Sequence, residues 1–301
     1  MPAEPTRPVT DHGPILVTGA LGFVAARLLP GLLQRGARVV AVVRPGRDAG
    51  RLERAGIEVR RADLARADTG RAAAFAGAGA VVHLAGMSLV PGLVGELQAA
   101  GVRRGVFVSS AGVYTRLASS GAEAKRAGEA ALRSSGLAWT VLRPSMIYGL
   151  PGDRNLERLL RWLSRSPIVP VPGRGRVLQQ PVHVDDLVAA LIGALERPGS
   201  AGHDYDVGGP EPLTLRALIE ESARAAGRRA FVVPMPLRPV WTLVRAGRGM
   251  GLRLPVRPEQ VLRLEESKAV DIGPARRDLG FDPRSFRDGI RAEVDLLGEG
   301  P

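Results

Sequence analysis

The sequence predicts an α/β fold: a doubly wound parallel sheet of the Rossmann type, with a smaller, discontinuous C-terminal substrate lobe. One sign is the apolar run 15–17, which ends in Thr18 and a turn spaced by Gly19 and Gly22, followed by apolar residues at helical spacing. A second sign is that further apolar runs alternate with helical segments, which is typical of a parallel sheet covered on both faces. Right-handed crossovers then give the doubly wound order.

The later strands are expected at 37–43, 57–60, 80–84, 105–109 and 138–142. Past Gly149 the alternation changes. Helices are expected around 154–165, 185–195, 240–248 and 282–297, a strand at 203–207 returns to the sheet, and Thr214 caps a helix that reaches about residue 226. We therefore assign 13–149 plus 179–207 to a dinucleotide-binding domain and 150–178 plus 208–301 to the substrate lobe.

Residues 1–12 are rich in proline and polar groups and lack the apolar core of a secretory signal, so we expect a disordered leader on a cytoplasmic protein. The longest apolar runs are too short to span a bilayer, so no membrane partner is expected. The absence of cysteine excludes disulfides and thiolate chemistry, and the four scattered histidines lack ligand spacing, so no metal site is expected.

The net charge of +12 has two interpretations, a nucleic-acid surface or an anionic small ligand. Lysine occurs only at Lys125 and Lys268, so 40 of the 42 basic residues are arginines, and they are spread along a chain with 4% aromatic residues. A nucleic-acid surface needs clustered phosphate contacts, often with stacking rings. We therefore expect a small-molecule partner and no nucleic acid; the alternative would show DNA binding that falls steeply with salt.

The turn at Gly19, Gly22 and Ala25 predicts a dinucleotide site, because a glycine turn lets the backbone approach a pyrophosphate at a helix N-terminus. Arg44 stands where the second strand ends. An acid there would bind ribose hydroxyls, whereas an arginine pairs with a 2′-phosphate, and Arg47 could reinforce it. This favours NADP over NAD, against the alternative of a solvated loop arginine.

Six segments, in order, resemble the short-chain dehydrogenase/reductase superfamily in its extended or atypical branch, the epimerase/dehydratase-like group. They are TGALGFVA (18–25), ADL (62–64), VVHLAG (81–86), VFVSSAGVY (106–114), LRPSMIYG (142–149) and QPVHVDDL (180–187). The last is most similar to the nucleotide-binding accessory subunit of respiratory complex I and its bacterial relatives. The resemblance covers nearly all of residues 13–290.

The resemblance implies positions for the coenzyme. Asp63 and Leu64 stand where family members touch the adenine, Ala85 and Gly86 where small residues admit a ribose, and Pro144 beside the nicotinamide amide. His83 is interpreted as a packed core residue. The residues expected to bind the coenzyme are Thr18, Gly19, Leu21, Gly22, Phe23, Arg44, Arg47, Asp63, Leu64, Ala85, Gly86, Ser109, Lys125, Pro144, Ser145 and Ile147.

The resemblance also implies general acid–base catalysis, in which Ser110 orients the substrate oxygen and Lys125 holds the nicotinamide ribose. The family's tyrosine belongs four residues before the lysine, one helical turn away, and this chain has Gly121 there. Tyr114, Tyr148 or water are the candidate proton donors.

The lobe offers two further signals. Arg154, Arg158, Arg161 and Arg165 recur at helical spacing, which is more typical of a solvated face than of a substrate site. Nucleotide-sugar enzymes of the family carry an arginine where this chain has Gln179, which argues against a sugar nucleotide. The segments 86–102 and 110–125 are short for the family, which favours a monomer over a dimer.

Two functions remain open. The first is an NADP(H)-dependent oxidoreductase or epimerase acting on a small carbonyl or hydroxyl compound. The second is a catalytically silent protein that holds NADPH as a structural or sensing ligand. The missing tyrosine favours the second, and the presence of Ser110 and Lys125 favours the first.

Overall fold

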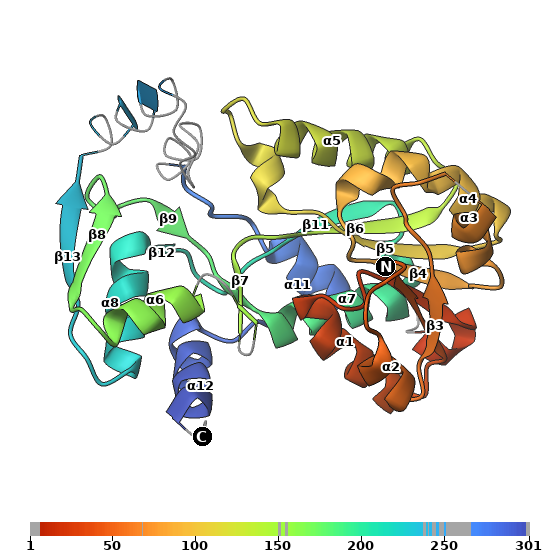
Figure 1. Ribbon diagram of the computed structural model, residues 1–301, viewed down its shortest axis with the longest axis horizontal. Helices are drawn as coiled ribbons and strands as arrows, with labels where there is room; N and C mark the ends of the chain where they lie inside the picture. The colour runs from red at the N-terminus through yellow and green to blue at the C-terminus, as the bar shows by residue number, and fades with distance from the viewer. Residues whose placement is uncertain are drawn as a thin grey trace.

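Seven parallel strands form the central sheet in the order β11-β6-β5-β4-β1-β2-β3, as the computed structural model in Figure 1 shows. The structure describes residues 7–67, 69–149, 152–153, 156–236, 239, 241–242, 245–246, 250 and 266–298. The strands are β1 (Ile15–Thr18), β2 (Val39–Val43), β3 (Glu58–Arg61), β4 (Ala80–His83), β5 (Arg104–Val108), β6 (Ala138–Pro144) and β11 (His203–Val207). The predicted doubly wound sheet is confirmed, including the return of 203–207 to its edge.

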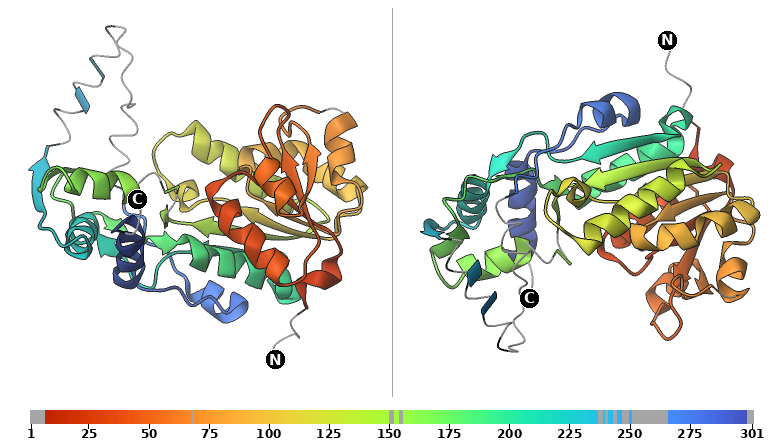
Figure 2. Two further views of the ribbon diagram at one scale, coloured as in Figure 1. Left: turned by 60° about the horizontal axis from the view of Figure 1, so that its bottom comes forward. Right: turned by 90° about the horizontal axis from the view of Figure 1, so that it is seen from above.

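Alternation along each strand divides the core into two layers, because successive side chains point to opposite faces. Ile15 and Val17 face one layer with α1 (Phe23–Gln34), α7 (Val184–Glu196) and α11 (Gly273–Leu279). Leu16 faces the other, with α3 (Thr69–Phe75), η2 (Met87–Gly92), α4 (Val94–Ala99) and α5 (Ser120–Arg133). The two views in Figure 2 show helices on both sides of the sheet.

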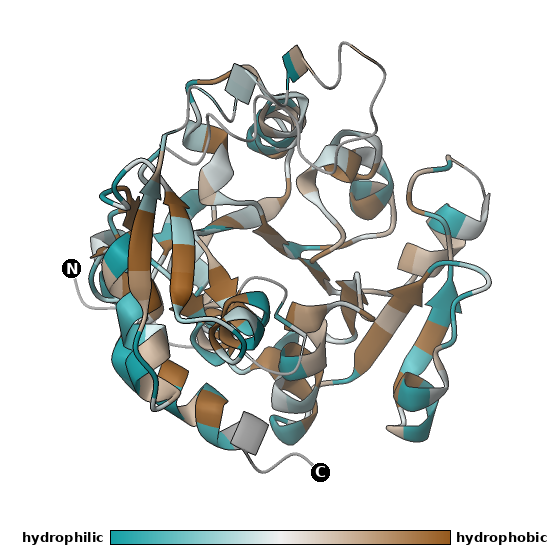
Figure 3. Cartoon of the chain, turned by 60° about the vertical axis from the view of Figure 1, so that its left-hand side comes forward, coloured by the Kyte–Doolittle hydropathy of each residue, from teal (hydrophilic) through white to brown (hydrophobic). Residues whose placement is uncertain are grey.

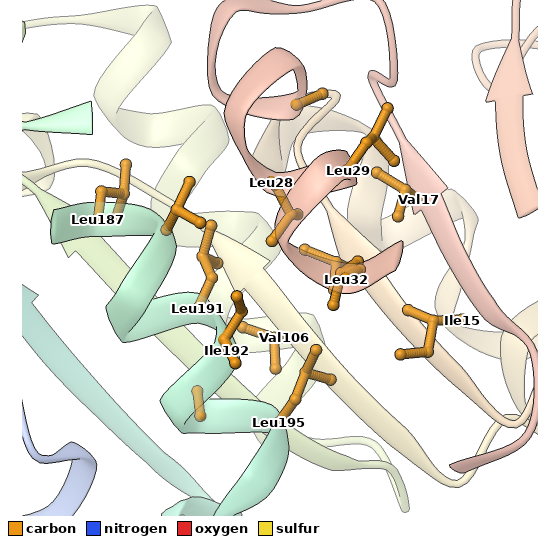
Figure 4. Packing of buried hydrophobic residues seen from close by; sticks show 14 of the residues in the cluster. Ile15, Val17, Leu28, Leu29, Leu32, Val106, Leu187, Leu191, Ile192 and Leu195 are labelled. Carbon is orange, nitrogen blue, oxygen red and sulfur yellow. The ribbon is translucent and has the colours of Figure 1, made fainter. Parts of the chain in front are cut away.

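In the first layer, leucines of α1 and α7 pack against each other and against the sheet, as Figure 4 shows. Leu28 and Leu32 of α1 and Leu191 of α7 are fully buried against the sheet. Burying each such side chain contributes about 1.5–3 kcal/mol. This packing fixes α1, and with it the glycine turn that precedes it.

The lobe lies beyond the carboxyl ends of the strands and is built from α6 (Leu156–Leu163), α8 (Leu215–Ala225) and α12 (Phe286–Gly298). Small strand pairs join it: β7 (Ile147–Tyr148) with β10 (Val182–His183), β9 (Leu178–Gln179) with β12 (Leu213–Thr214), and β8 (Ile168–Pro172) with β13 (Phe231–Met235). Figure 3 shows hydrophobic and hydrophilic stripes on its helices, as amphipathic packing requires. The Thr214 side chain caps α8, as predicted. In the part of the chain that the structure describes, no helix has the length and apolar character needed to cross a membrane.

Two expected boundaries are wrong. Within the leader 1–12, residues 9–12 form a 3-10 helix, η1 (Val9–His12), because Val9 is buried and the His12 ring nitrogen bonds the Leu195 carbonyl at 2.9 Å. The segment 270–281, expected in the lobe, packs on the Rossmann core, because α11 buries Ala275 and Leu279 against β11 and α7. Residues 1–6, Arg154 and most of the helix expected at 240–248 lie outside the described residues. α2 (Gly50–Arg54) and η3 (Ala111–Tyr114) complete the dinucleotide-binding domain, and η4 (Pro198–Ser200) precedes β11.

The QPVHVDDL segment holds the C-terminal part of the chain in place. His183 caps α7 and its Nε2 lies 2.8 Å from Glu293 of α12. Asp186 accepts hydrogen bonds from both the backbone amide and the guanidinium of Arg284. The motif is therefore structural in this chain.

Gly128 of α5 allows a close helix contact, since a Cβ there would overlap the Met87 carbonyl of η2. In an open helix, glycine to alanine stabilises by about 0.5–1 kcal/mol. We predict that Gly128→Ala instead lowers the free energy of unfolding by about 1–3 kcal/mol, as expected for overpacking. Gly121→Ala on the same helix is the control, because Gly121 has open space around it and should be neutral or stabilising. Urea denaturation measures both, and equal effects would contradict the contact.

Candidate active site

The turn between β1 and α1 leaves a cradle of bare backbone at the edge of the sheet. Gly19 has φ +68°, and a Cβ there would lie 2.9 Å from the Leu84 carbonyl carbon, so only glycine fits. Gly22 is the N-cap of α1, with no side chain bonded to the first helical N–H groups. Unpaired amides at the start of a twelve-residue helix attract an anionic group. The residues present therefore fit a pyrophosphate.

A cleft of about 500 Å³ extends from this turn across the tips of β1, β2 and β4. It brings together eight of the predicted coenzyme residues: Gly19, Leu21, Gly22, Arg44, Arg47, Asp63, Leu64 and Ala85. Asp63 accepts a hydrogen bond from the Ala65 amide and lies 3.7 Å from Arg66, so it shapes its own turn and does not cap a helix. The small side chains that line the cleft leave room for a flat ring.

The arginines sit on a turn that the sequence encodes directly. In Arg44-Pro45-Gly46-Arg47, the Arg47 amide bonds the Arg44 carbonyl at 3.2 Å, and Gly46 has φ +76°. Proline and glycine at the two central positions are typical of a type II turn. Both guanidinium groups therefore stand on one exposed loop, and the structure records no ion pair for either within its described ranges.

A neighbouring hollow of about 750 Å³ opens on the outer side of that loop. Arg61 and Arg66 line it together with Arg44 and Arg47. Arg61 donates to the Arg47 carbonyl at 2.9 Å, which ties the end of β3 to the loop. Sequence reasoning missed Arg61 and Arg66; the signal was the register of β3 beside β2, which places its last arginine next to the second strand's tip.

Some predicted coenzyme residues lie outside both hollows. The Thr18 hydroxyl lies 2.9 Å from His83 Nδ1 and accepts from the Leu84 amide, so it joins β1 to β4. His83 is fully buried, and burial lowers its pKa to about 4, as a packed neutral histidine requires. Phe23 is the first residue of α1 and lies beside Gly152. The Gly86 carbonyl oxygen lies 3.0 Å from Nε2 of His83. Pro144 is buried at the end of β6.

A second cavity, of about 770 Å³, lies between the sheet and the lobe. It brings Ser110, Lys125, Ser145 and Ile147 together, all predicted site residues. Ser110 begins η3 and accepts the Gly112 amide at 3.1 Å, and Lys125 Nζ lies 3.3 Å from the Gly121 carbonyl. The rest of the lining is mostly apolar and comes from α6, β8 and α8, with Gln179 and Lys268 added. Sequence reasoning missed this apolar lining and the position of Lys268 in it.

A buried ion pair supports this second cavity from behind. Arg143 of β6 donates to Glu129 of α5 at 2.6 Å and 3.0 Å, and the Ser109 hydroxyl donates to the same carboxylate at 2.7 Å. Burial alone raises the pKa of Glu129, but the hydrogen bonds from Arg143 and Ser109 outweigh burial and hold its pKa below the ordinary 4.5. Ser109 is therefore a supporting residue and does not line the cavity.

Tyr114 takes part in the same network of hydrogen bonds around Arg143. It is 52% exposed, its hydroxyl donates to Asp206 at 2.9 Å, and Arg143 donates to it at 2.9 Å. Partial burial and the Asp206 charge raise its pKa to about 12, whereas the family's mechanism needs a lowered one. The structure does not bring Tyr114 into the cavity with Ser110.

Tyr148 lies in the core of the lobe. It is completely buried, packs edge-on against His183 and Phe286, and its hydroxyl sits where a Cβ on Gly289 would be. Burial, and then the Asp186 charge, raise its pKa. The structure therefore separates both candidate phenols from Ser110 and Lys125.

The charged stripe of the lobe is solvated, as the sequence suggested. Arg158, Arg161 and Arg165 are exposed, and Arg161 pairs with Glu157 on the same helix. None of these three lines either cavity described above.

The ion pair behind the cavity predicts a pH-dependent stability. Glu129→Gln should lower the free energy of unfolding by about 3 kcal/mol at pH 7, because it removes the more buried of the two carboxylates that pair with Arg143 and leaves only Asp204. A carboxyl whose pKa is lowered on folding stabilises above its unfolded value and loses that contribution as pH falls through the folded one. The difference from wild type should therefore shrink below about pH 4.5.

Urea unfolding at several pH values measures this. Glu157→Gln is the control, since its exposed pair with Arg161 should be worth less than about 1 kcal/mol. A constant difference from pH 7 down to acid would contradict the assignment.

Comparison with known proteins gives a consistent picture. A family model described as NAD(P)H-binding matches residues 19–158. Ceramide reductase of Caulobacter vibrioides is 31% identical over 205 residues, which cover 62% of this chain and 62% of that protein. The 2-alkyl-3-oxoalkanoate reductase of Stenotrophomonas maltophilia is 28% identical over 331 residues, covering 92% and 97%.

The mitochondrial NADH dehydrogenase 1 alpha subcomplex subunit 9 of Arabidopsis thaliana is 33% identical over 121 residues. That stretch spans 40% of this chain and only 30% of the subunit. The expected resemblance to this subunit type is thus confirmed over part of the chain.

Solved structures share the fold. The crystal structure of gox2253 superposes with a TM-score of 0.77 at 24% identity over 95% of this chain and 98% of that one. MoeE5 in complex with UDP-glucose and NAD gives 0.73 at 23% identity over 95% and 99%. Together, the NAD(P)H-binding match over residues 19–158, the ordered motifs and the parallel sheet fit the atypical short-chain dehydrogenase/reductase type.

Proposed function

We propose that this protein is an NADP(H)-dependent oxidoreductase that acts on a carbonyl or hydroxyl compound. The observation that carries the proposal is the arrangement of two hollows along one sheet edge. A dinucleotide-shaped cleft bordered by four arginines meets the tips of β1 to β3, and a cavity with Ser110 and Lys125 meets the tips of β5 and β6. The reductases among the relatives support the reaction class.

The hollow lined by Arg44, Arg47, Arg61 and Arg66 supports a preference for NADP over NAD. Arg44 and Arg47 lie on the loop that follows β2, beside the cleft that is lined in part by Asp63 and Leu64. A 2′-phosphate there would meet planar guanidinium donors, which bind phosphate through paired hydrogen bonds. The adenine would lie against Leu64, and the pyrophosphate on the amides after Gly22.

The coenzyme, when bound, supplies a hydride for the carbonyl carbon, and the protein must supply a proton for the carbonyl oxygen. Ser110 can donate a hydrogen bond to that oxygen from the end of β5. Lys125, one helical turn from the supporting Glu129, presents an ammonium group to the same cavity. Since neither phenol reaches this place, we assign the proton to Lys125, directly or through one water.

Gln179 supports a substrate other than a sugar nucleotide. It lines the cavity at the position where nucleotide-sugar enzymes of the family hold a diphosphate with arginine. An uncharged amide leaves that diphosphate without a charge partner. We therefore favour reduction of a carbonyl compound over epimerisation of a nucleotide sugar.

Arg44→Asp tests the coenzyme. We expect NADPH affinity to fall at least about tenfold, because hydrogen bonds to a charged group contribute about 1.5–3 kcal/mol, while NADH affinity holds or rises. Arg103→Asp is the control, as it makes the same charge change at an exposed arginine that precedes the amino end of β5, whereas Arg44 follows the carboxyl end of β2. Calorimetric titration of both coenzymes measures the ratio, and an unchanged NADPH/NADH ratio in Arg44→Asp would contradict the assignment.

Lys125→Met tests the chemistry. We expect kcat for NADPH oxidation with a panel of aliphatic ketones to fall by about 100-fold or more, since a positioned acid contributes about 10²–10⁴. NADPH binding should change much less than kcat. Arg158→Met, which removes a cation from the outer face of α6, should leave the rate unchanged.

A wild-type protein that binds NADPH tightly yet oxidises it with no ketone, alcohol or nucleotide sugar would favour the second function, a silent NADPH-binding protein. In that case Gly121→Tyr, which adds a phenol one turn before Lys125, would still report whether the cavity can support the reaction. Failure to bind either coenzyme would refute both functions.

A further inference from the structure

The loop that carries Arg44 and Arg47 has little packing of its own. Residues 44–48 are all exposed, so no buried side chain of the loop holds it against the sheet. Within the loop, the Arg47 amide closes the turn on the Arg44 carbonyl, and Asp48 accepts a hydrogen bond from the Gly50 amide at 2.9 Å. These local bonds set the shape of the turn, but they do not fix its position relative to the neighbouring strand.

Arg61 supplies the contact that fixes this position. It is the last residue of β3 and pairs with Val43 of β2 in the parallel register, so it stands beside the start of the loop. Its Nη1 donates to the Arg47 carbonyl at 2.9 Å, and its Nη2 donates to Oε1 of Glu53 on α2 at 3.5 Å. In the part of the chain that the structure describes, no other hydrogen bond joins residues 44–48 to a strand of the sheet.

The shape of a guanidinium group suits this tether. Its N–H donors form a rigid planar fork, so one amino group can bond the loop while the other bonds α2. The pair of Arg61 with Glu53 is half-exposed on both sides and contributes little free energy by itself. The Arg47 carbonyl is therefore the partner that matters. A loop that is placed before its ligand arrives loses less conformational entropy when the ligand binds.

We propose that Arg61 is a positioning residue for coenzyme selection. By holding the Arg47 carbonyl, it places the guanidinium groups of Arg44 and Arg47 at the hollow where the 2′-phosphate of NADP would bind. Arg61 lines the same hollow, but both of its amino groups already have partners, so it acts through the loop and not on the phosphate. The proposal rests on the proposed NADP(H)-dependent function for its ligand, whereas the tether itself does not.

Selection is tested by calorimetric titration of 2′,5′-ADP and 5′-ADP into the full-length protein, since these two probes differ only in the 2′-phosphate. In Arg61→Met the preference for 2′,5′-ADP should fall at least about fivefold, because hydrogen bonds to a charged group weaken steeply when their donors are misplaced. The affinity for 5′-ADP should stay the same. Arg61→Lys should recover part of the loss, because an ammonium group can still donate to the Arg47 carbonyl. An unchanged preference in Arg61→Met would overturn the proposal.

Arg60→Met is the matched control. Arg60 precedes Arg61 but leaves β3 on the opposite face, where it donates to Glu58 at 2.8 Å and to the Ala74 and Ala76 carbonyls. This variant removes the same charge and more hydrogen bonds, yet it does not touch the loop, so the preference for 2′,5′-ADP should be kept. An equal loss in both variants would show a general effect of charge or stability and would contradict the positioning role.

A variant background separates positioning from direct contact. In Arg44→Met/Arg47→Met, the loop has no guanidinium left to place, so adding Arg61→Met should cause no further loss of 2′,5′-ADP affinity. A further loss as large as that of Arg61→Met alone would mean that Arg61 binds the phosphate itself, and the positioning role would be wrong.

Hydrogen exchange tests the tether without any ligand. In the free protein, the Arg47 amide should exchange faster in Arg61→Met than in wild type, and at the wild-type rate in Arg60→Met. Equal exchange in all three proteins would refute the tether. A wild type that binds 2′,5′-ADP no better than 5′-ADP would refute the NADP preference together with this inference. A wild type that prefers 2′,5′-ADP, with the same preference in Arg61→Met, would refute this inference alone.

Discussion

The buried ion pair between Arg143 and Glu129 fixes the positions of Ser110 and Lys125, the two polar residues on which the proposed reaction depends. It joins β6 to α5, Ser109 adds β5 through the same carboxylate, and Arg143 also pairs with Asp204 of β11. A buried pair of this kind contributes little net stability, because removing two charges from water offsets their attraction. What it provides here is a single arrangement: Lys125 stands one turn from Glu129, and Ser110 follows Ser109, so both are set by one carboxylate.

The coenzyme half is built by other means. Around Gly19 and Gly22 the ligand surface is backbone, which the leucine packing of α1 against α7 keeps in position. The arginines stand on a tight turn whose form follows from proline and glycine, with little burial. On the proposed function, the backbone would bind what all dinucleotides share, and the exposed arginines would select NADP over NAD. This division explains why charge changes at Arg44 should alter selectivity without loss of the fold.

The sequence predicted the sheet, the glycine turn, the arginine loop and the position of Ser110 and Lys125, because each depends on local spacing. It failed where contacts are long-range. The pairing of α11 with β11 and α7, the order in residues 9–12, and the burial of Tyr148 under α12 depend on segments more than 60 residues apart. The convergence of Lys268 on Lys125 is of the same kind, and only the rarity of lysine hinted at it. Arg61 and Arg66 were missed because their relevance depends on strand register.

The glycine at the family's tyrosine position has a consequence for the proposed reaction. Gly121 is exposed and has open space around it, and its carbonyl is the hydrogen-bond partner of Lys125 at 3.3 Å. Gly121 offers no phenol, so the proposed reaction needs another proton donor, and we propose Lys125, which lines the same cavity as Ser110.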